Sequence, residues 1–274
     1  LIPAPLPIGY HQIRLTSARE SHTAHVLVAP KLCHRPPRGG ERGRWGTFLP
    51  LYALRTKRDW GAGDFTGLRT LLEWSDSIGA DVVGTLPLLP QFLADPCDPS
   101  PYSPVSRQFW NEFFVDPTAT PDWPLSAAAQ RIAAKSRSSI TSFRRTRLID
   151  YHAAMRAKRD VLEALAKTCF ARATRRADLV RYLKLHPELD EYARFRAACE
   201  RHGVPWTKWS ARMRNGKLRR GDYDDTAYRY HAYVQWIAEH QIEKAAARLP
   251  GVDRGLYLDL PLGVNPDGYD TWSE

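Results

Sequence analysis

The chain reads TFLPL at residues 47–51 and DVVGTL at residues 81–86, two short apolar runs with the length and character of buried strands. Between them lie a glycine-rich loop, WGAG at residues 60–63, and an amphipathic segment. Asp64 is a suitable N-cap for a helix there, which Gly79 would end, and the apolar positions have helical spacing: Leu68, Leu71, Leu72 and Ile78. A strand, a helix and a strand joined by short links form a βαβ unit, so we expect two parallel strands.

A third apolar run, residues 255–260, follows a long segment, residues 126–249, whose pattern is mostly helical. Trp74 and Trp236 fall within helical patterns, so we expect both rings in the core. Three parallel strands cannot close a barrel, and a complete (β/α)8 barrel takes about 250 residues without insertions. The fold class that we predict is therefore α/β: a partial TIM barrel with its first three strands and a large helical insertion outside the sheet.

The N-terminal residues have a different pattern, with short apolar runs at residues 12–16 and 25–29 and prolines before and after them. This pattern is typical of the last strands of a β module, so we expect residues 1–37 to be the tail of a β-sandwich domain. Residues 38–44 read as a linker, and residues 45–274 as the barrel part. Because the chain starts without methionine and reaches only a third strand, we expect it to be a piece of a longer protein.

Charge is distributed unevenly along the chain. The formal net charge is +10, yet residues 131–220 hold 24 Lys and Arg against 8 Asp and Glu. This block contains no zinc finger, RNP-like run or glycine-rich RNA motif, so a solvated helical face is favoured over a nucleic-acid site. The cysteines and histidines lack the spacing of metal ligands, and no apolar run approaches the roughly 20 residues of a membrane span. We expect no metal, cofactor, nucleic acid or membrane, and a cytoplasmic location.

Aromatic rings and carboxylates gather in the segments that follow the predicted strands, residues 52–63, 87–111 and 259–272. In (β/α)8 barrels the chemistry lies at this end of the strands. A sugar ring has apolar C–H faces and a rim of hydroxyls, so such a mixture suits it. Asp259 stands inside an apolar run, where an unpaired carboxylate is costly, which favours a functional role. Tyr102 follows an X-Pro dipeptide, whose extended geometry would hold its ring in place.

Several motifs, in order along nearly the whole chain, resemble those of the 4-α-glucanotransferases, also called amylomaltases or disproportionating enzymes, of glycoside hydrolase family 77. The start of the chain, LPIGYH at residues 6–11, is similar to the end of the β-sandwich that precedes the barrel in longer members. The other matching stretches are WGTFLPL at 45–51, WGAGDF at 60–65, VVGTLPLLP at 82–90, SPYSPVS at 100–106, NEFFVD at 111–116, Asp150-Tyr151 with Lys158, and LYLDLPLGV at 256–264.

The resemblance implies an enzyme of the α-amylase clan that moves an α-1,4-glucan segment to the 4-hydroxyl of an acceptor. Its partners would be maltodextrins and amylose, with glucose as a further acceptor. The chemistry would be retaining: one carboxylate forms a glycosyl-enzyme, and a second serves as acid and then base. The family's nucleophile and general acid follow its fourth and fifth strands, beyond Glu274. We therefore expect an N-terminal fragment with no catalytic residue, inactive alone.

By the same resemblance, the chain carries substrate-binding residues. Tyr102 would stack on the donor sugar next to the scissile bond, Ser100 would lie beside it, and Asp259 would line the same subsite. Trp60 and Trp110 are further candidates, because they offer flat apolar faces in the segments after the strands.

Two alternatives remain open. A non-catalytic glucan-binding module would use the same aromatic residues, but it would be expected to begin with methionine and to close its own core. A basic helical nucleic-acid binder would use residues 131–220 and would bind with a steep salt dependence. The second alternative leaves the three strand-and-loop motifs unexplained.

Overall fold

The computed structural model describes residues 5–32, 45–94, 97–247 and 255–274. The chain divides into two compact units, Leu1–Gly43 and Arg44–Glu274. The predicted linker, residues 38–44, lies outside the described residues.

The described residues of the first unit form a β-hairpin. Strands β1 (Gly9–Thr16) and β2 (Ser21–Val28) pair antiparallel, with Gly9 opposite Val28 and Thr16 opposite Ser21. Ser17 holds the turn, because its Oγ accepts a hydrogen bond from the backbone N–H of Glu20 at 3.1 Å. The prediction of strands here is confirmed, and the β-sandwich itself stays a prediction.

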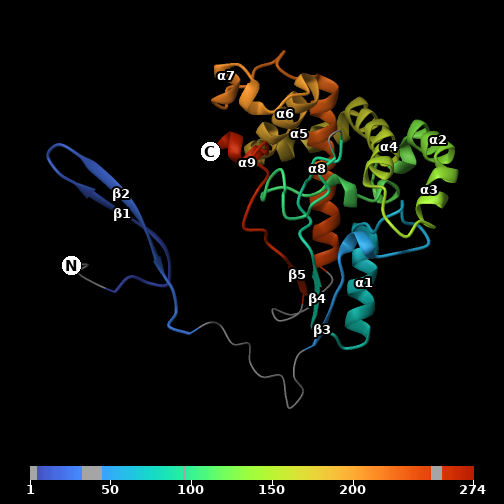
Figure 1. The fold of residues 1–274 in the computed structure, drawn as a ribbon, viewed down its shortest axis with the longest axis horizontal. Coiled ribbons are helices and arrows are strands. Elements are labelled where there is room, and N and C mark those ends of the chain that lie inside the picture. Colours follow the sequence, from blue (N-terminus) through green and yellow to red (C-terminus); the bar gives the residue numbers. More distant parts are fainter. Residues whose placement is uncertain (1–4, 33–44, 95–96, 248–254) are drawn as a thin grey trace. The chain divides into compact units, whose positions relative to one another are not determined.

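The second unit is built on a three-stranded parallel sheet in the order β3-β4-β5, shown in Figure 1. Its strands are β3 (Gly46–Phe48), β4 (Val82–Thr85) and β5 (Gly255–Leu258), and α1 (Phe65–Ser77) connects the first two. The parallel pairing of all three strands confirms the predicted βαβ unit and the adjacent third strand. Strand β3 stops before Pro50, which has no N–H to donate, and a 3-10 turn follows at Leu51–Ala53.

Helices occupy most of the chain between β4 and β5, as predicted. Residues at the expected positions define their ends. The Asp150 side chain accepts from the N–H of Ala153 at 2.9 Å to start α4, and the backbone of Gly203 ends α6 at a φ of 61°. The helices are α2 (Ala127–Lys135), α3 (Arg137–Phe143), α4 (Tyr151–Ala171), α5 (Ala173–Leu185), α6 (Pro187–His202), α7 (Ala211–Arg214) and α8 (Asp225–Ala246), and α9 (Tyr269–Ser273) follows β5.

Two apolar cores support this arrangement. The larger one lies between the sheet, α1, α4 and α8, and the smaller one lies around α6 and α9. Trp236 of α8 is buried in the larger core, as predicted, but Trp74 of α1 is 52 % exposed. The prediction for Trp74 was wrong because it stands two residues after the buried Leu72, about 200° around the helix. Among the described residues, no helix is both long and apolar enough to cross a bilayer.

Candidate functional site

Tyr102 and Asp259 meet directly. The Tyr102 hydroxyl donates to Asp259 Oδ2 at 2.8 Å, although the two residues are 157 positions apart in the chain. Tyr102 lies in the long segment after β4 and Asp259 directly follows β5, so both come from the carboxyl ends of neighbouring parallel strands. The Tyr102 side chain is 53 % exposed and is therefore accessible to a ligand.

Asp259 is fixed by the sheet. Its backbone N–H donates to the carbonyl of Thr85 at 3.3 Å, which extends the pairing of β4 and β5 by one residue. Thr85 is fully buried, and its Oγ1 accepts from the N–H of Leu51 at 3.0 Å, which ties the segment after β3 to the same place. The carboxylate thus emerges from the strand end, where an ionised group can stay in contact with water.

Ser100 holds the backbone of Tyr102 in place. The Ser100 hydroxyl accepts from the backbone N–H of Tyr102 at 3.3 Å, and its carbonyl accepts from the N–H of Ser103 at 3.2 Å. Asp98 in turn accepts from the N–H of Ser100 at 3.2 Å. These short-range bonds form a tight turn that presents the Tyr102 ring.

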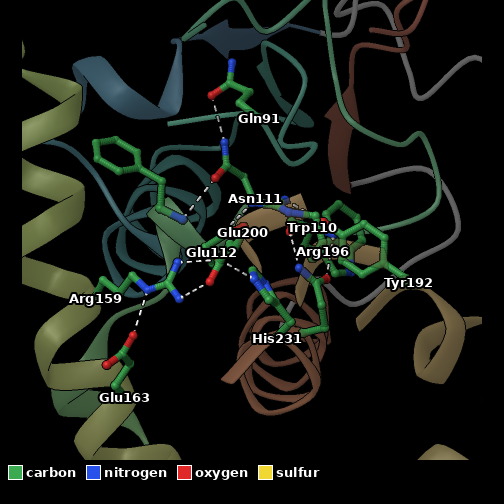
Figure 2. Close-up of polar contacts among 12 residues, drawn as sticks. Gln91, Trp110, Asn111, Glu112, Arg159, Glu163, Tyr192, Arg196, Glu200 and His231 are labelled. Carbon is green, nitrogen blue, oxygen red and sulfur yellow. Dashed lines mark hydrogen bonds and ion pairs between the residues drawn. The ribbon is translucent and has the colours of Figure 1, made fainter. Parts of the chain in front are cut away.

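The base of the Tyr102 loop is anchored in buried structure. Asn111 donates from Nδ2 to Gln91 Oε1 at 2.9 Å and accepts from the N–H of Phe113 at 3.0 Å, as Figure 2 shows for the Gln91–Asn111 pair. Gln91 donates to the carbonyl of Pro99 at 2.7 Å. Because Asn111 and Gln91 are both buried, the loop closes over satisfied polar groups.

The loops after β4 and β5 are joined to each other. Asp270 accepts from the Ser106 hydroxyl at 2.5 Å and from the backbone N–H of Arg107 at 2.8 Å, and both Asp270 and Ser106 are buried. Gly268 is needed where the loops touch, since a Cβ there would lie 2.5 Å from the carbonyl oxygen of Val105. The contacts between the two loops therefore fix the positions of Tyr102 and Asp259 relative to each other.

Electrostatics keeps Tyr102 protonated. The hydrogen bond to the Asp259 carboxylate raises the pKa of Tyr102 above its usual value, and Tyr52 is close enough to contribute to the increase. Burial raises the pKa of Tyr151 to about 12, again with a contribution from Tyr52. The rings of Tyr52 and Tyr151 pack edge to face at 6.1 Å. With raised pKa values, Tyr102 and Tyr151 remain hydrogen-bond donors at neutral pH.

Tyr52 and Tyr151 were missed as individual candidates. For Tyr52 a signal existed, because it directly follows a predicted strand. Tyr151 gave no such signal, since it begins a helix far along the chain.

Trp60 does not join the site. Its side chain is 5 % exposed and belongs to the larger core. The cause is a tight loop closed by Asp59, which accepts from the N–H of Gly61 at 2.9 Å, while Phe143 of α3 covers Gly61 so closely that a Cβ would lie 2.6 Å from its own Cβ. Little of the ring is accessible to a ligand, and the substrate-binding role expected for Trp60 stays a prediction.

Trp110 is half-buried, and hydrogen bonds to side chains of α8 restrict its rotation. Its indole N–H donates to Glu239 Oε2 at 2.5 Å, and its backbone N–H donates to Gln235 Oε1 at 3.0 Å. It lines a separate cavity with side chains of α5, α6 and α8, and Tyr102 and Asp259 do not line that cavity. Its proposed contact with sugar stays a prediction.

The helices behind the site are tied together by buried and half-buried ion pairs. Arg159 of α4 binds both oxygens of Glu200 in α6, at 2.6 and 2.8 Å, and Glu200 accepts from His231 Nε2 of α8 at 2.7 Å (Figure 2). Burial lowers the pKa of His231, so the ring is neutral and donates through Nε2. Lys158, also buried, donates to the carbonyl of Phe113. In the described part of the chain, no three His, Cys, Asp or Glu side chains converge as metal ligands.

Comparison with known proteins places these features in one family. The family model described as 4-alpha-glucanotransferase matches residues 49–274. The chain is 30 % identical to the 4-alpha-glucanotransferase of Mycobacterium tuberculosis (strain H37Rv) over 289 aligned positions, which cover all of this chain and 40 % of that relative.

Two solved structures share the fold. The crystal structure of amylomaltase from Corynebacterium glutamicum superposes with a TM-score of 0.73 at 23 % identity, over 98 % of this chain and 38 % of that one. The amylomaltase from Streptococcus agalactiae in complex with acarbose has a TM-score of 0.63 at 18 % identity, over 84 % and 46 % of the two chains. The chain spans about 40 % of the length of the curated relatives that it matches first. It belongs to the 4-alpha-glucanotransferase family.

Proposed function

We propose that this chain forms the donor-binding part of an enzyme that transfers α-1,4-glucan segments to the 4-hydroxyl of an acceptor glucan or of glucose. The observation that carries the proposal is the 2.8 Å hydrogen bond between Tyr102 and Asp259, which joins two loops after neighbouring parallel strands in a chain of this family. The parallel order β3-β4-β5 supports a (β/α)8 barrel of which these are the first three strands.

The pair combines the two kinds of contact that a glucose ring needs. The exposed Tyr102 ring offers an apolar face to the C–H groups of the sugar. Asp259 Oδ2 is engaged by Tyr102, and the carboxylate keeps further lone pairs to accept from sugar hydroxyls. Because the protonated Tyr102 donates to Asp259, it also fixes the direction in which the carboxylate faces the ligand.

The chemical step requires two further carboxylates. In retaining transfer, one attacks the anomeric carbon as the donor's glycosidic bond breaks, and the other protonates the leaving oxygen. The second carboxylate then takes the proton of the acceptor 4-hydroxyl, whose oxygen attacks the anomeric carbon and breaks the bond to the first carboxylate. By the family resemblance, these groups follow the fourth and fifth barrel strands, and β5 corresponds to the third. The role of this chain is therefore to bind and orient the donor.

The other functions are less well supported. The arginines of residues 131–220 are not a uniform free surface, since several pair with carboxylates: Arg159 with Glu200, Arg175 with Asp122, Arg194 with Asp190, Arg196 with Glu112 and Arg212 with Asp222. This internal pairing disfavours a nucleic-acid interface. A non-catalytic glucan-binding module would share Tyr102 and Asp259, but membership of a transferase family favours the enzyme.

Calorimetric titration with maltoheptaose tests the binding role. Tyr102→Ala should weaken the affinity of the chain about tenfold, because the ring face and the orientation of Asp259 are both lost. Tyr10→Ala is the matched control, since Tyr10 is 89 % exposed on β1 of the other unit. Equal affinities of the Tyr102→Ala variant and the unaltered chain would refute the proposal.

A further inference from the structure

The cavity that Trp110 lines lies among the helices, bordered by the loop after β4. Its volume is about 300 Å³, and we call it the Trp110 cleft. Its lining combines aromatic, acidic and amide side chains, among them Trp110, Tyr182, His186, Glu188, Gln235 and Glu239. A volume of this size stands at the lower end of the range of small-molecule sites, about 300–1,000 Å³.

One wall of the cleft is rigid. Gln235 brackets the backbone of Trp110, accepting from its N–H at 3.0 Å and donating to its carbonyl at 2.6 Å. The indole N–H donates to Glu239 Oε2 at 2.5 Å, which fixes the plane of the ring. A residue held by two backbone hydrogen bonds and one from its ring can serve as a binding surface at little entropic cost.

Another part of the lining is a stacked pair of rings. The rings of Tyr182 and His186 lie 4.2 Å apart with an interplanar angle of 29°, and His186 Nδ1 lies 3.2 Å from Glu188 Oε1. Burial, followed by the charges of Glu239, Glu243 and Glu188, raises the pKa of Tyr182 to about 12. The cleft thus offers a phenol donor, two carboxylate acceptors and aromatic faces together.

We propose that the Trp110 cleft binds one or two glucose residues of an α-glucan, as a second place of attachment for a long chain; the inference rests on the proposed function. The carboxylates of Glu188 and Glu239 oppose an anionic ligand, and their acceptor oxygens suit a neutral ligand rich in hydroxyls. Trp110 and Tyr182 supply the apolar faces that the C–H groups of a sugar need. Because Tyr102 and Asp259 are not part of the lining, the two places can be tested separately.

Fluorine NMR of the full 274-residue chain, labelled with fluorotryptophan, gives a local readout. The chain has nine tryptophans, and the Trp110 resonance is assigned as the one that disappears in Trp110→Phe. Maltoheptaose should shift this resonance in the unaltered chain and equally in Tyr102→Ala. Tyr182→Ala should weaken the response at least about tenfold.

Tyr182 is half-buried, so replacing it also affects folding. A second variant at an exposed residue makes the test independent of that effect. Glu188→Ala changes an exposed rim residue and should weaken the response about fivefold. Glu73→Ala, an exposed glutamate on α1, is the control and should leave it unchanged.

The outcomes separate the two proposals. A Trp110 resonance that stays in place, while calorimetry still detects maltoheptaose binding that depends on Tyr102, would overturn the cleft and leave the proposed function standing. A Trp110 shift that depends on Tyr182 and Glu188, without any effect of Tyr102→Ala in calorimetry, would support the cleft and refute the donor site. A shift that persists undiminished in both cleft variants would also overturn the inference.

Discussion

Replacing Asp270 by alanine should destabilise the second unit and weaken glucan binding together, because this residue joins the two loops that carry Tyr102 and Asp259. Its side chain is 5 % exposed. It accepts from the Ser106 hydroxyl at 2.5 Å and from the backbone N–H of Arg107 at 2.8 Å.

The magnitude follows from those two bonds. Hydrogen bonds to a charged group contribute about 1.5–3 kcal/mol each to stability. Ser106 is fully buried, and Asp270→Ala leaves its hydroxyl proton without an acceptor, although its oxygen still accepts from the N–H of Gln108. We therefore expect a loss of about 3–5 kcal/mol in the free energy of unfolding. Asp270→Asn keeps one acceptor oxygen but turns an N–H₂ group toward a second donor, and should lose about 1.5–3 kcal/mol.

Urea unfolding followed by tryptophan fluorescence measures the loss. Trp272 is a suitable reporter, because it is buried in the smaller core and donates to the carbonyl of Met213 at 2.8 Å. Asp178→Ala is the matched control: Asp178 pairs with Arg181 at 3.5 Å on an exposed face of α5, where such a pair contributes at most about 1 kcal/mol. If Asp270→Ala unfolds at the same urea concentration as Asp178→Ala, the loops are held by something else and the reasoning fails.

Two buried groups behind the site give further predictions. Lys158→Met should lower the free energy of unfolding by about 2 kcal/mol, since the carbonyl of Phe113 loses its donor. The control Lys135→Met, at an exposed position of α2, should lower it by under about 0.5 kcal/mol. Equal urea midpoints for the two variants would contradict this account. Burial lowers the pKa of His231 below its unfolded value of about 6.5, so the unfolded chain takes up the proton first and stability falls as the pH drops from 7.5 toward 5.5. His231→Gln should make that fall shallower, and an unchanged slope in unfolding experiments at the two pH values would show that His231 is not its source.

The supporting fold was predictable where its signals are local. Asp64 and Asp150 cap helices with their own side chains. The apolar periodicity of a helix likewise depends only on residues that are close together in the chain. The parallel order of β3, β4 and β5 follows from chain connectivity, because short links and helical crossovers permit few arrangements. The same rule predicted that Tyr102 and Asp259 belong to one end of the sheet.

Sequence patterns carry least information where distant segments decide burial and packing. Trp60 is buried because α3, about 80 positions further along the chain, covers its loop, and no periodicity near residue 60 carries that information. Trp74 is a different case, because its position about 200° around α1 from the buried Leu72 follows from the sequence spacing itself. Tyr151 packs against Tyr52 from the first residue of α4, a helix that is far from the strand ends in the sequence.

The contact between an α-1,4-glucan and the Tyr102–Asp259 pair is best tested by a crystal structure of the chain with maltoheptaose. The account predicts a glucose ring packed on the face of Tyr102, with a sugar hydroxyl within about 2.5–3.0 Å of an Asp259 carboxylate oxygen. Maltoheptaose bound elsewhere on the chain, with Tyr102 and Asp259 in contact only with each other, would contradict the account.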